Sequence, residues 1–271
     1  MKAVDRVFVI TGAGNGMGRE LTLLLLKKGA RGVAAVDISE AGLQETVRLA
    51  GEDGSKISCH PVNIADRKAV EALPEAVIKA HGQVDGLINN AGIIQRFVRF
   101  GELDFKEIDR VLDVNFWGPI YMVKAFLPYL TKRLEAHIVN TSSMGGFLPV
   151  PGQTIYGASK AAIKLFTEGL YAELLASNVH VTAVFPGAIA TNIAANSGVG
   201  MSAEGAADSG KAQSFKMTRA DVAAKMIVDA MERNDFQVYV GQDAKLMNLL
   251  YRVAPYRAVH IIYSQMKSLL G

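Results

Sequence analysis

Residues 7–18, VFVITGAGNGMG, decide how this chain folds. The four apolar residues predict a buried strand, and a helix-forming stretch follows from Arg19 to Lys28. A strand, a glycine-rich turn and a helix start in this order aim free backbone N–H groups and the positive end of a helix dipole at a phosphate. The spacing is T-G-x-x-x-G-x-G and not G-x-G-x-x-G, because Met17 stands where the third glycine would come. A tight strand-to-helix connection that binds nothing is the alternative interpretation.

Apolar runs alternate with helix-forming stretches along most of the 271 residues. This alternation is typical of α/β proteins, and a chain that is 50% hydrophobic can fill one large core. We therefore expect a single-domain, Rossmann-type, doubly wound parallel sheet of about seven strands with helices on both faces. The main domain is expected over residues 1–243, and a C-terminal helical extension over 244–271. Pro74 predicts a kink or a restart within the helical run 66–80.

Asp37 ends the second apolar run, about twenty residues after the glycine turn. A carboxylate at that place can accept hydrogen bonds from both hydroxyls of an adenosine ribose, and it repels a 2′-phosphate. Neither Asn15 nor Ile38 is a basic residue that would pair with such a phosphate. The sequence therefore favours NAD over NADP, although an aspartate that only opens the following turn would look the same.

Tyr156 and Lys160 stand four residues apart in TIYGASKAA, which puts a phenol and an ammonium on one face of a helix. A phenol titrates near pH ~10, and a desolvated neighbouring cation lowers that pKa toward neutrality, where a proton donor and acceptor is useful. A tyrosine packed on the aliphatic stem of an exposed lysine is the ordinary interpretation of an isolated pair.

Ser143 follows the strand-like run 137–141 and precedes Tyr156 by thirteen residues. A hydroxyl at the carboxyl end of a parallel strand lies where open α/β sheets bind ligands. It could hold a substrate oxygen against the phenol, whereas an ordinary polar strand exit is the alternative for Ser142 and Ser143.

In this combination the residues resemble the short-chain dehydrogenase/reductase family, in the subgroup with TGxxxGxG and YxxxK motifs. The resemblance extends from Val4 to about Gly241. Three further motifs agree with it: NNAG at 89–92, DVNFWG at 113–118 and PGAIAT at 186–191.

The resemblance implies a catalytic role for four residues. Tyr156 would be the general acid/base that exchanges a proton with an alcohol or a ketone. Lys160 would lower the pKa of that phenol and bind the nicotinamide ribose. Ser143 would position the substrate oxygen and stabilise charge on it. Asn115, at an interruption of its helix, would hold a water that joins Lys160 to solvent.

The resemblance also implies how NAD would bind. The glycine turn and Asp37 would hold the adenosine half, and the segment 186–191 the nicotinamide end. Asn63 and Ile64 stand where the family usually has Asp-Val, but an amide can still pair with an adenine edge. The implied cofactor-binding residues are Gly12, Asn15, Gly16, Met17, Gly18, Asp37, Ile38, Asn63, Ile64, Asn89, Ala91, Gly92, Tyr156, Lys160, Pro186, Gly187, Ile189 and Thr191.

The substrate pocket is expected between Ser143 and Tyr156, where the chain is mostly apolar. Such a lining suits a hydrophobic secondary alcohol or ketone better than a sugar. The expected pocket residues are Ser143, Met144, Gly145, Phe147, Pro149 and Tyr156. A substrate lid is expected at about 188–215, and its small residues predict that it is mobile without ligand. TRAD at 218–221 predicts a capping box that opens the next helix.

The C-terminal segment from Ala244 to Gly271 is apolar and basic, with no acidic residue, and Pro255 divides it into two helical pieces. One hypothesis is that its apolar side covers the active-site mouth or a partner subunit. The other is that it lies on an anionic membrane surface, as basic amphipathic helices do. Packing on protein is the preferred interpretation, and a peripheral membrane contact stays open.

Three classes of function are compared. An NAD-dependent alcohol dehydrogenase or ketone reductase agrees best with the motifs. An NADP-dependent reductase of lipid or 3-oxoacyl substrates is disfavoured by Asp37. A non-catalytic dinucleotide-binding sensor would have no reason to keep Asn115, Ser143, Tyr156 and Lys160 together.

Composition argues against several other classes. A net charge of +3, with bases mixed among acids, disfavours nucleic-acid binding. The single cysteine, Cys59, excludes an internal disulfide and suits a reducing cytoplasm. The five histidines lack ligand-like spacing, so no metal is expected. No apolar stretch reaches the ~18 residues of a membrane span, and we see no leader before the first strand, so we expect a cytoplasmic protein.

The resemblance further implies a homodimer or homotetramer. The helices around Asn115 and Tyr156 would pack against those of a neighbour, since Leu165, Phe166 and Leu170 continue their apolar face.

Overall fold

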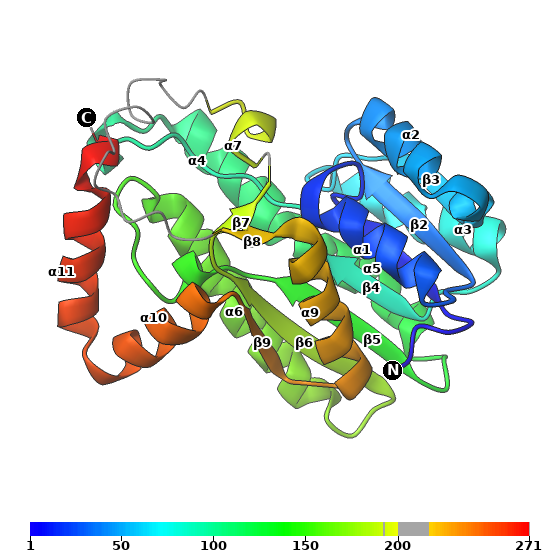
Figure 1. The fold of residues 1–271 in the computed structure, drawn as a ribbon. Helices are drawn as coiled ribbons and strands as arrows, with labels where there is room; N and C mark the ends of the chain where they lie inside the picture. The colour runs from blue at the N-terminus through cyan, green and yellow to red at the C-terminus, as the bar shows by residue number, and fades with distance from the viewer. Residues whose placement is uncertain (192, 200–216, 271) are drawn as a thin grey trace.

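A computed structural model describes residues 1–191, 193–199 and 217–270, and it confirms the doubly wound α/β fold (Figure 1). Seven strands form one parallel sheet in the order β3-β2-β1-β4-β5-β6-β9, and a small parallel pair, β7 and β8, lies apart from it. The strands are β1 (Val7–Thr11), β2 (Gly32–Asp37), β3 (Ile57–Pro61), β4 (Gly86–Asn89), β5 (Ala136–Thr141), β6 (Val179–Pro186), β7 (Ile189–Ala190), β8 (Thr218–Arg219) and β9 (Gln237–Val240).

Both faces of the sheet are buried. In β1, Phe8 and Ile10 belong to one core cluster, whereas Val9 belongs to the other. Successive side chains of a strand point to opposite faces, so a strand that is covered on both sides is apolar throughout. This explains why the first strand is a continuous apolar run.

Helices cover the two faces in separate groups. Leu25 of α1 and Ile227 of α9 lie in the first cluster, and Val77 of α3, Phe126 of α5 and Leu170 of α6 lie in the second. The helices are α1 (Gly16–Lys27), α2 (Glu40–Leu49), α3 (Arg67–His81), α4 (Phe105–Leu112), α5 (Gly118–Leu130), α6 (Thr154–Leu174), α7 (Ile193–Asn196), α9 (Ala220–Arg233), α10 (Gln242–Val253) and α11 (Pro255–Met266).

The strand order reverses between β1 and β4. From β1 the chain adds β2 and β3 on one side, and it then returns to add β4, β5, β6 and β9 on the other. The loops after β1 and β4 therefore separate at the carboxyl edge of the sheet, which is where open α/β sheets bind ligands.

Helix α3 does not restart at Pro74, because it runs unbroken through that residue, whereas a kink there stays a prediction. Proline removes one backbone hydrogen bond and costs about 3 kcal/mol inside a helix. Here Pro74 is buried together with Val70, Leu73 and Val77, so its packing against the core offsets that cost.

The C-terminal segment is helical and packs on the protein. Helices α10 and α11 stand beyond β9 at one end of the molecule (Figure 1). Met247, Ala258 and Ile262 are buried in a cluster with Leu148, which lies in the connection between β5 and α6. In the described part of the chain, no helix has the length and apolar character needed to cross a membrane.

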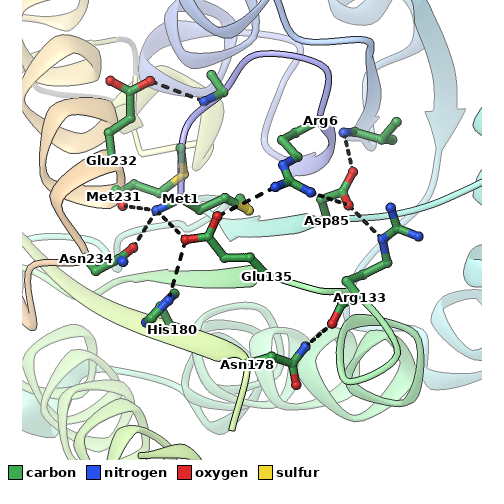
Figure 2. A network of polar contacts seen from close by, with 12 residues as sticks. Met1, Arg6, Asp85, Arg133, Glu135, Asn178, His180, Met231, Glu232 and Asn234 are labelled. Atoms are coloured by element: carbon green, nitrogen blue, oxygen red, sulfur yellow. Dashed lines mark hydrogen bonds and ion pairs between the residues drawn. The ribbon is translucent and has the colours of Figure 1, made fainter.

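A buried polar cluster joins the amino ends of the central strands (Figure 2). Asp85, which is fully buried just before β4, accepts hydrogen bonds from the backbone N–H of Val7 and from Gln83 Nε2, both at 2.8 Å. Its other oxygen accepts from Arg133 Nε at 2.7 Å, and Arg6 lies 3.6 Å away. One carboxylate therefore links β1, β4 and the loop before β5.

We predict that Asp85→Ala lowers the free energy of unfolding by about 3 to 5 kcal/mol, because it leaves Arg133 without its buried partner. Urea unfolding at neutral pH measures the change. Glu71→Ala, which breaks an exposed pair with Arg67, is the matched control and should change little. Equal effects of the two substitutions would contradict the structural role of Asp85.

Candidate active site

The glycine turn after β1 has no room for side chains. A Cβ on Gly18 would lie 2.0 Å from the Gly12 carbonyl oxygen, and one on Gly14 would lie 2.9 Å from the Asp37 carboxylate. Gly12 and Gly16 have positive φ values of 71° and 49°, which glycine adopts without strain. These positions therefore require glycine, and a glycine turn packed this closely between a strand and a helix N-terminus fits a dinucleotide pyrophosphate.

Asp37 is held against this turn. Its Oδ2 accepts a hydrogen bond from the Gly14 N–H at 2.9 Å, and its Oδ1 accepts one from the Ser39 N–H at 2.9 Å. Ile38 beside it is 73% exposed. The carboxylate thus lies where a ribose next to the glycine turn would meet it, with an apolar side chain open to cover an adenine.

Thr11 joins the turn to the NNAG segment. Its hydroxyl accepts hydrogen bonds from the N–H groups of Asn90 and Ala91, both at 3.0 Å. Asn90 Nδ2 also donates a hydrogen bond, to the Thr11 carbonyl at 3.1 Å. Asn89, in contrast, is buried in β4 and donates to Asn140 Oδ1 at 2.8 Å, so its side chain faces the neighbouring strand and not the cofactor cradle.

The other expected cofactor residues lie on two sides of the cradle. Thr191 is within 3.3 Å of the position that a Cβ on Gly16 would take, so the 186–191 segment reaches the glycine turn. At the adenine end, Asn63 is exposed and its Oδ1 accepts from the Ala65 N–H at 3.0 Å. Ile64 is buried against Gly118, which leaves only its backbone for an adenine.

Tyr156, Lys160 and Ser143 come together at the carboxyl end of β5. Lys160 Nζ lies 5.9 Å from the centroid of the Tyr156 ring and donates a hydrogen bond to the Thr141 carbonyl at 3.0 Å. The Tyr156 ring and the Ser143 hydroxyl approach Gly145 from two sides, 3.3 Å and 3.5 Å from the position of a Cβ there. A side chain at residue 145 would therefore crowd the proposed acid/base.

Burial dominates the titration of this pair. Burial lowers the pKa of Lys160 from 10.5 to about 8, and it raises the pKa of the Tyr156 phenol. A hydrogen bond with Ser143 acts on the phenol pKa in the opposite direction. Burial thus acts on the phenol in the direction opposite to the one expected of Lys160, and the lowering of its pKa by a protonated Lys160 stays a prediction. The physical reason is that both side chains are removed from water, which disfavours the charged form of each.

Asn115 lies in a π-helical turn, η3 (Asp113–Trp117), between α4 and α5. Its side chain is fully buried and pairs twice with the Ile93 backbone, accepting from N–H at 2.9 Å and donating to the carbonyl at 2.8 Å. A third bond, to Ser159 Oγ at 3.2 Å, ties it to helix α6. The Asn115 side chain thus bonds to protein through both its oxygen and its nitrogen, and its partner Ser159 directly precedes Lys160.

Gly92 lies beside both Asn115 and Lys160. A Cβ at this position would lie 3.1 Å from Lys160 Nζ and 3.2 Å from Asn115 Oδ1. The glycine of the NNAG segment therefore makes the space that the lysine head occupies.

The expected pocket residues do not all face one space. Met144 and Phe147 pack against the cluster formed with α10 and α11, and the Phe147 ring lies 5.9 Å from that of Phe185. Pro149 is exposed, whereas Gly145 lies beside Tyr156. Most of the expected lid, including residues 200–215, falls outside the described residues, and so does the predicted mobility.

Two residues near the site were not found from the sequence. Asp243, at the start of α10, accepts from the Ala188 N–H at 2.7 Å and so fixes the 186–191 segment. Gln95 is fully buried and bonds to the first turn of α6. No motif contains either residue, because each acts through a contact between segments that are distant in sequence.

The described residues hold no group of three or more His, Cys, Asp or Glu side chains arranged to bind a metal ion.

Comparison with known proteins identifies the family. A family model described as short chain dehydrogenase matches residues 6–201. The chain belongs to the short-chain dehydrogenase family. It is 40% identical over 257 residues to SadH of Mycobacterium tuberculosis, a protein named as an oxidoreductase, and the match covers 92% of this chain and 90% of SadH. This chain is accordingly an oxidoreductase of that family.

Three further proteins are similar to this chain, and two of them are structures solved with a dinucleotide bound. The 3-oxoacyl-[acyl-carrier-protein] reductase FabG of Thermotoga maritima is 38% identical over 193 residues, 70% of this chain and 77% of FabG. A short-chain dehydrogenase of Burkholderia phymatum in complex with NAD matches with a TM-score of 0.81 at 26% identity, over 93% of this chain and 96% of that chain. One from Burkholderia cenocepacia in complex with NADP matches with a TM-score of 0.79 at 25% identity, over 97% and 99% of the chains.

The lowered pKa of Lys160 predicts a pH-dependent stability. Between about pH 8 and 10.5 the native protein binds fewer protons at Lys160 than the unfolded chain does, so the free energy of unfolding gains about 3 kcal/mol as pH rises through this window. Lys160→Met lacks this gain. The free energy of unfolding of the variant minus that of wild type should therefore be largest near neutral pH and decrease toward pH 10.5. Urea unfolding across this pH range measures the difference.

Lys56→Met, at a half-exposed lysine paired with Asp53, is the control and should show no such trend. A constant difference between Lys160→Met and wild type over the window would contradict the buried state of Lys160.

Proposed function

We propose that this enzyme is an NAD(H)-dependent oxidoreductase that interconverts a hydrophobic secondary alcohol and its ketone. The convergence of Tyr156, Lys160 and Ser143 at the carboxyl end of β5, on the same edge of the sheet as the glycine turn and Asp37, carries this proposal. Proton transfer and dinucleotide binding would then occur at one edge of the sheet.

The chain's own residues supply the proton chemistry. NAD, when bound, takes up a hydride from the carbinol carbon or returns one to the carbonyl carbon. Tyr156 accepts the hydroxyl proton during oxidation and donates it during reduction. Ser143 holds the substrate oxygen by a hydrogen bond and stabilises the charge that develops there. Lys160, while protonated, favours the phenolate, so its titration near pH 8 limits activity on the alkaline side.

Tyr156→Phe should lower turnover by at least about a thousandfold, since general acid/base catalysis contributes about 10² to 10⁴-fold. Dinucleotide affinity should stay within about threefold, because the phenol hydroxyl is a minor part of the binding site. The measurement is a screen of secondary alcohols and ketones, graded by size and polarity, that follows the absorbance of reduced nicotinamide. Full activity in the Phe variant, or no turnover of any substrate by wild type, would refute the proposal.

NAD is favoured over NADP because a 2′-phosphate would meet the Asp37 carboxylate next to the Gly14 N–H. We expect wild type to bind NADH at least about tenfold more tightly than NADPH, since like charges at such a distance cost more than about 1 kcal/mol. Asp37→Ser combined with Ile38→Arg should reverse the preference in a fluorescence titration of both reduced dinucleotides. Tighter NADPH binding by wild type would refute NAD as the cofactor.

A second candidate is an NADP-dependent reductase of 3-oxoacyl substrates. The FabG relative and the NADP-bound neighbour are the observations in its favour. Reduction of a short 3-oxoacyl thioester with NADPH, at a higher kcat/KM than any simple ketone with NADH, would establish it. A dinucleotide sensor without activity is less well supported, because the described residues include the complete set of Asn115, Ser143, Tyr156 and Lys160.

Apolar surroundings support a hydrophobic substrate. The connection from Ser143 to Tyr156 packs its Leu148 into the cluster of α10 and α11, and Phe147 contacts Phe185 and Tyr239. A cytoplasmic location stays a prediction from the single free cysteine.

A homo-oligomer is proposed through α4, η3 and α6. Phe105, Trp117 and Leu165 are 82%, 43% and 69% exposed on these elements, whereas Leu170, which was expected on the same face, is buried in the subunit's own core. Leu165→Glu should therefore shift the mass in multi-angle light scattering toward the monomer, and Leu175→Glu on the following loop should not. An unchanged mass in the first variant would refute this interface.

A further inference from the structure

Helix α6, which carries Tyr156 and Lys160, begins without a side-chain cap of its own. The residue before its first turn, Gln153, makes no side-chain bond to the helix. The first N–H groups of a helix lack intrahelical partners, and a cap side chain normally accepts hydrogen bonds from its second and third residues. In α6 these residues are Ile155 and Tyr156 itself.

Gln95 supplies the missing cap from a distant segment. Its Oε1 accepts hydrogen bonds from the N–H groups of Ile155 at 2.8 Å and Tyr156 at 3.0 Å. Its Nε2 donates to the Gly152 carbonyl at 2.9 Å, and its own carbonyl accepts from Gln153 Nε2 at 2.8 Å. The side chain is fully buried, so it shields these groups from bulk water.

The same short segment binds two other parts of the site. The Ile93 backbone pairs with the Asn115 side chain, and the Ile94 N–H donates to Ser197 Oγ at 3.0 Å, just after α7. Residues 93–95 therefore connect the π-helical turn, the end of α7 and the start of the catalytic helix.

We propose that Gln95 is a positioning residue that fixes the backbone of Tyr156, and with it the direction of the phenol toward substrate; its effect on turnover rests on the function proposed above. Two hydrogen bonds from adjacent N–H groups fix both the position and the orientation of the first turn of α6. Loss of the amide would let this turn shift within the buried site, and a displacement of about 1 Å at a reacting group costs about a hundredfold in rate.

Gln95→Leu and Gln95→Glu test this role. Leucine fills the space without an acceptor. Glutamate keeps an oxygen acceptor at the positive end of the helix dipole, but its second oxygen replaces the donor that faces the Gly152 carbonyl. We expect kcat to fall about ten- to a hundredfold in the leucine variant, with the dinucleotide Kd changed less than about threefold and the apparent pKa of the kcat profile moved. Glutamate should recover part of the loss. If the leucine variant does not fold, the pH profiles of kcat for Gln95→Glu and wild type are compared. Identical profiles and equal kcat values would overturn the positioning role.

Asn178→Ala is the matched control. It removes another side-chain amide, one that donates to the backbone carbonyls of Leu130 and Arg133. This amide lies at the amino ends of the strands, away from the proposed site. It should lower Tm without moving kcat or the pH profile. A Gln95→Leu variant that behaves in the same way would overturn the positioning role.

Hydrogen–deuterium exchange of the peptide that contains residues 152–157 separates this inference from the proposed reaction. Faster exchange at Ile155 and Tyr156 in Gln95→Leu than in Asn178→Ala is expected whether or not a substrate is known. Unchanged exchange would refute the cap itself, whereas failure to find any substrate would refute only the proposed reaction.

A separate observation concerns the outward sides of α10 and α11. Five large apolar side chains there are each more than half exposed, and we call them the outer C-terminal face: Leu246, Leu249, Val253, Tyr256 and Tyr263. Their spacings of three, four and seven place them along one side of each helix. The opposite sides carry the buried Met247, Ala258 and Ile262. Packing on the protein therefore uses only one side of this segment.

The charged side chains of the segment from residue 244 onward have one sign, and the acidic residue of α10, Asp243, is bonded to the Ala188 N–H. Lys245, Arg252, Arg257 and Lys267 lie on the same segment, which has no Asp or Glu from residue 244 onward. A second copy docked face to face would bring these cations together without a counter-charge, because a twofold contact pairs each patch with itself. Apolar and aromatic side chains flanked by lysine and arginine fit the surface of an anionic bilayer.

We infer that the outer C-terminal face binds membrane surfaces that contain anionic phospholipids. The test is flotation of the full chain with vesicles of phosphatidylcholine alone and of phosphatidylcholine mixed with phosphatidylglycerol. Binding to the anionic vesicles only, weakened by salt, is expected. Leu249→Ser with Tyr263→Ser should weaken it at least about tenfold, and Arg252→Gln about fivefold.

Lys132→Gln with Leu134→Ser is the control, since it changes a cation and a 97% exposed leucine at the other edge of the sheet. Equal binding to neutral vesicles, no binding, or a loss in the control as large as in the outer-face variants would overturn the inference. The inference would also be overturned if the wild type did not bind vesicles and Leu249→Ser with Tyr263→Ser lowered the oligomer mass. That result would assign the face to a second copy.

Discussion

The parallel pairing of β1 with β4 is the constraint on which the site depends. It sets the loop after β1, with its glycine turn, beside the loop after β4, with its NNAG segment, and Thr11 joins the two by three hydrogen bonds. The next strand, β5, brings Ser143 and the lysine of α6 to the same edge. The strand order therefore places the glycine turn, proposed to bind phosphate, and the side chains proposed to transfer protons at the same end of the sheet.

Burial then determines the chemistry of that edge. Lys160 keeps its ammonium inside the protein, where it donates a hydrogen bond to the Thr141 carbonyl, and its pKa falls to about 8. A lysine of this kind is poised to titrate near neutral pH, at a cost in stability to the native state. Asn115 bonds to Ser159, the residue before the lysine, and Gly92 lies against the lysine head, so both contacts hold the lysine in place.

The C-terminal helices belong to the site as well as to the surface. Asp243 of α10 fixes Ala188 beside the expected nicotinamide end, and Met247 and Ile262 cover the segment after Ser143. Asp243 also fills the space that a side chain on Gly187 would need, with its carboxylate 2.2 Å from the position of a Cβ there. The same two helices present the outer C-terminal face to the outside, so membrane contact and active-site geometry would share one structural element.

Sequence alone determined the fold and predicted the main site residues, because these depend on local periodicity and on motifs at fixed spacing. Residues 7–18 indicated the strand, the turn and the helix start, and the positions of Tyr156 and Lys160 predicted an acid/base pair. Only the tertiary structure decided the features that depend on contacts between distant segments. Pro74 stays within an unbroken helix because the core packs around it, and Thr218 enters strand β8 instead of capping α9. Gln95 caps a helix that starts 59 residues later, which no local pattern encodes because the distance closes only when the sheet forms.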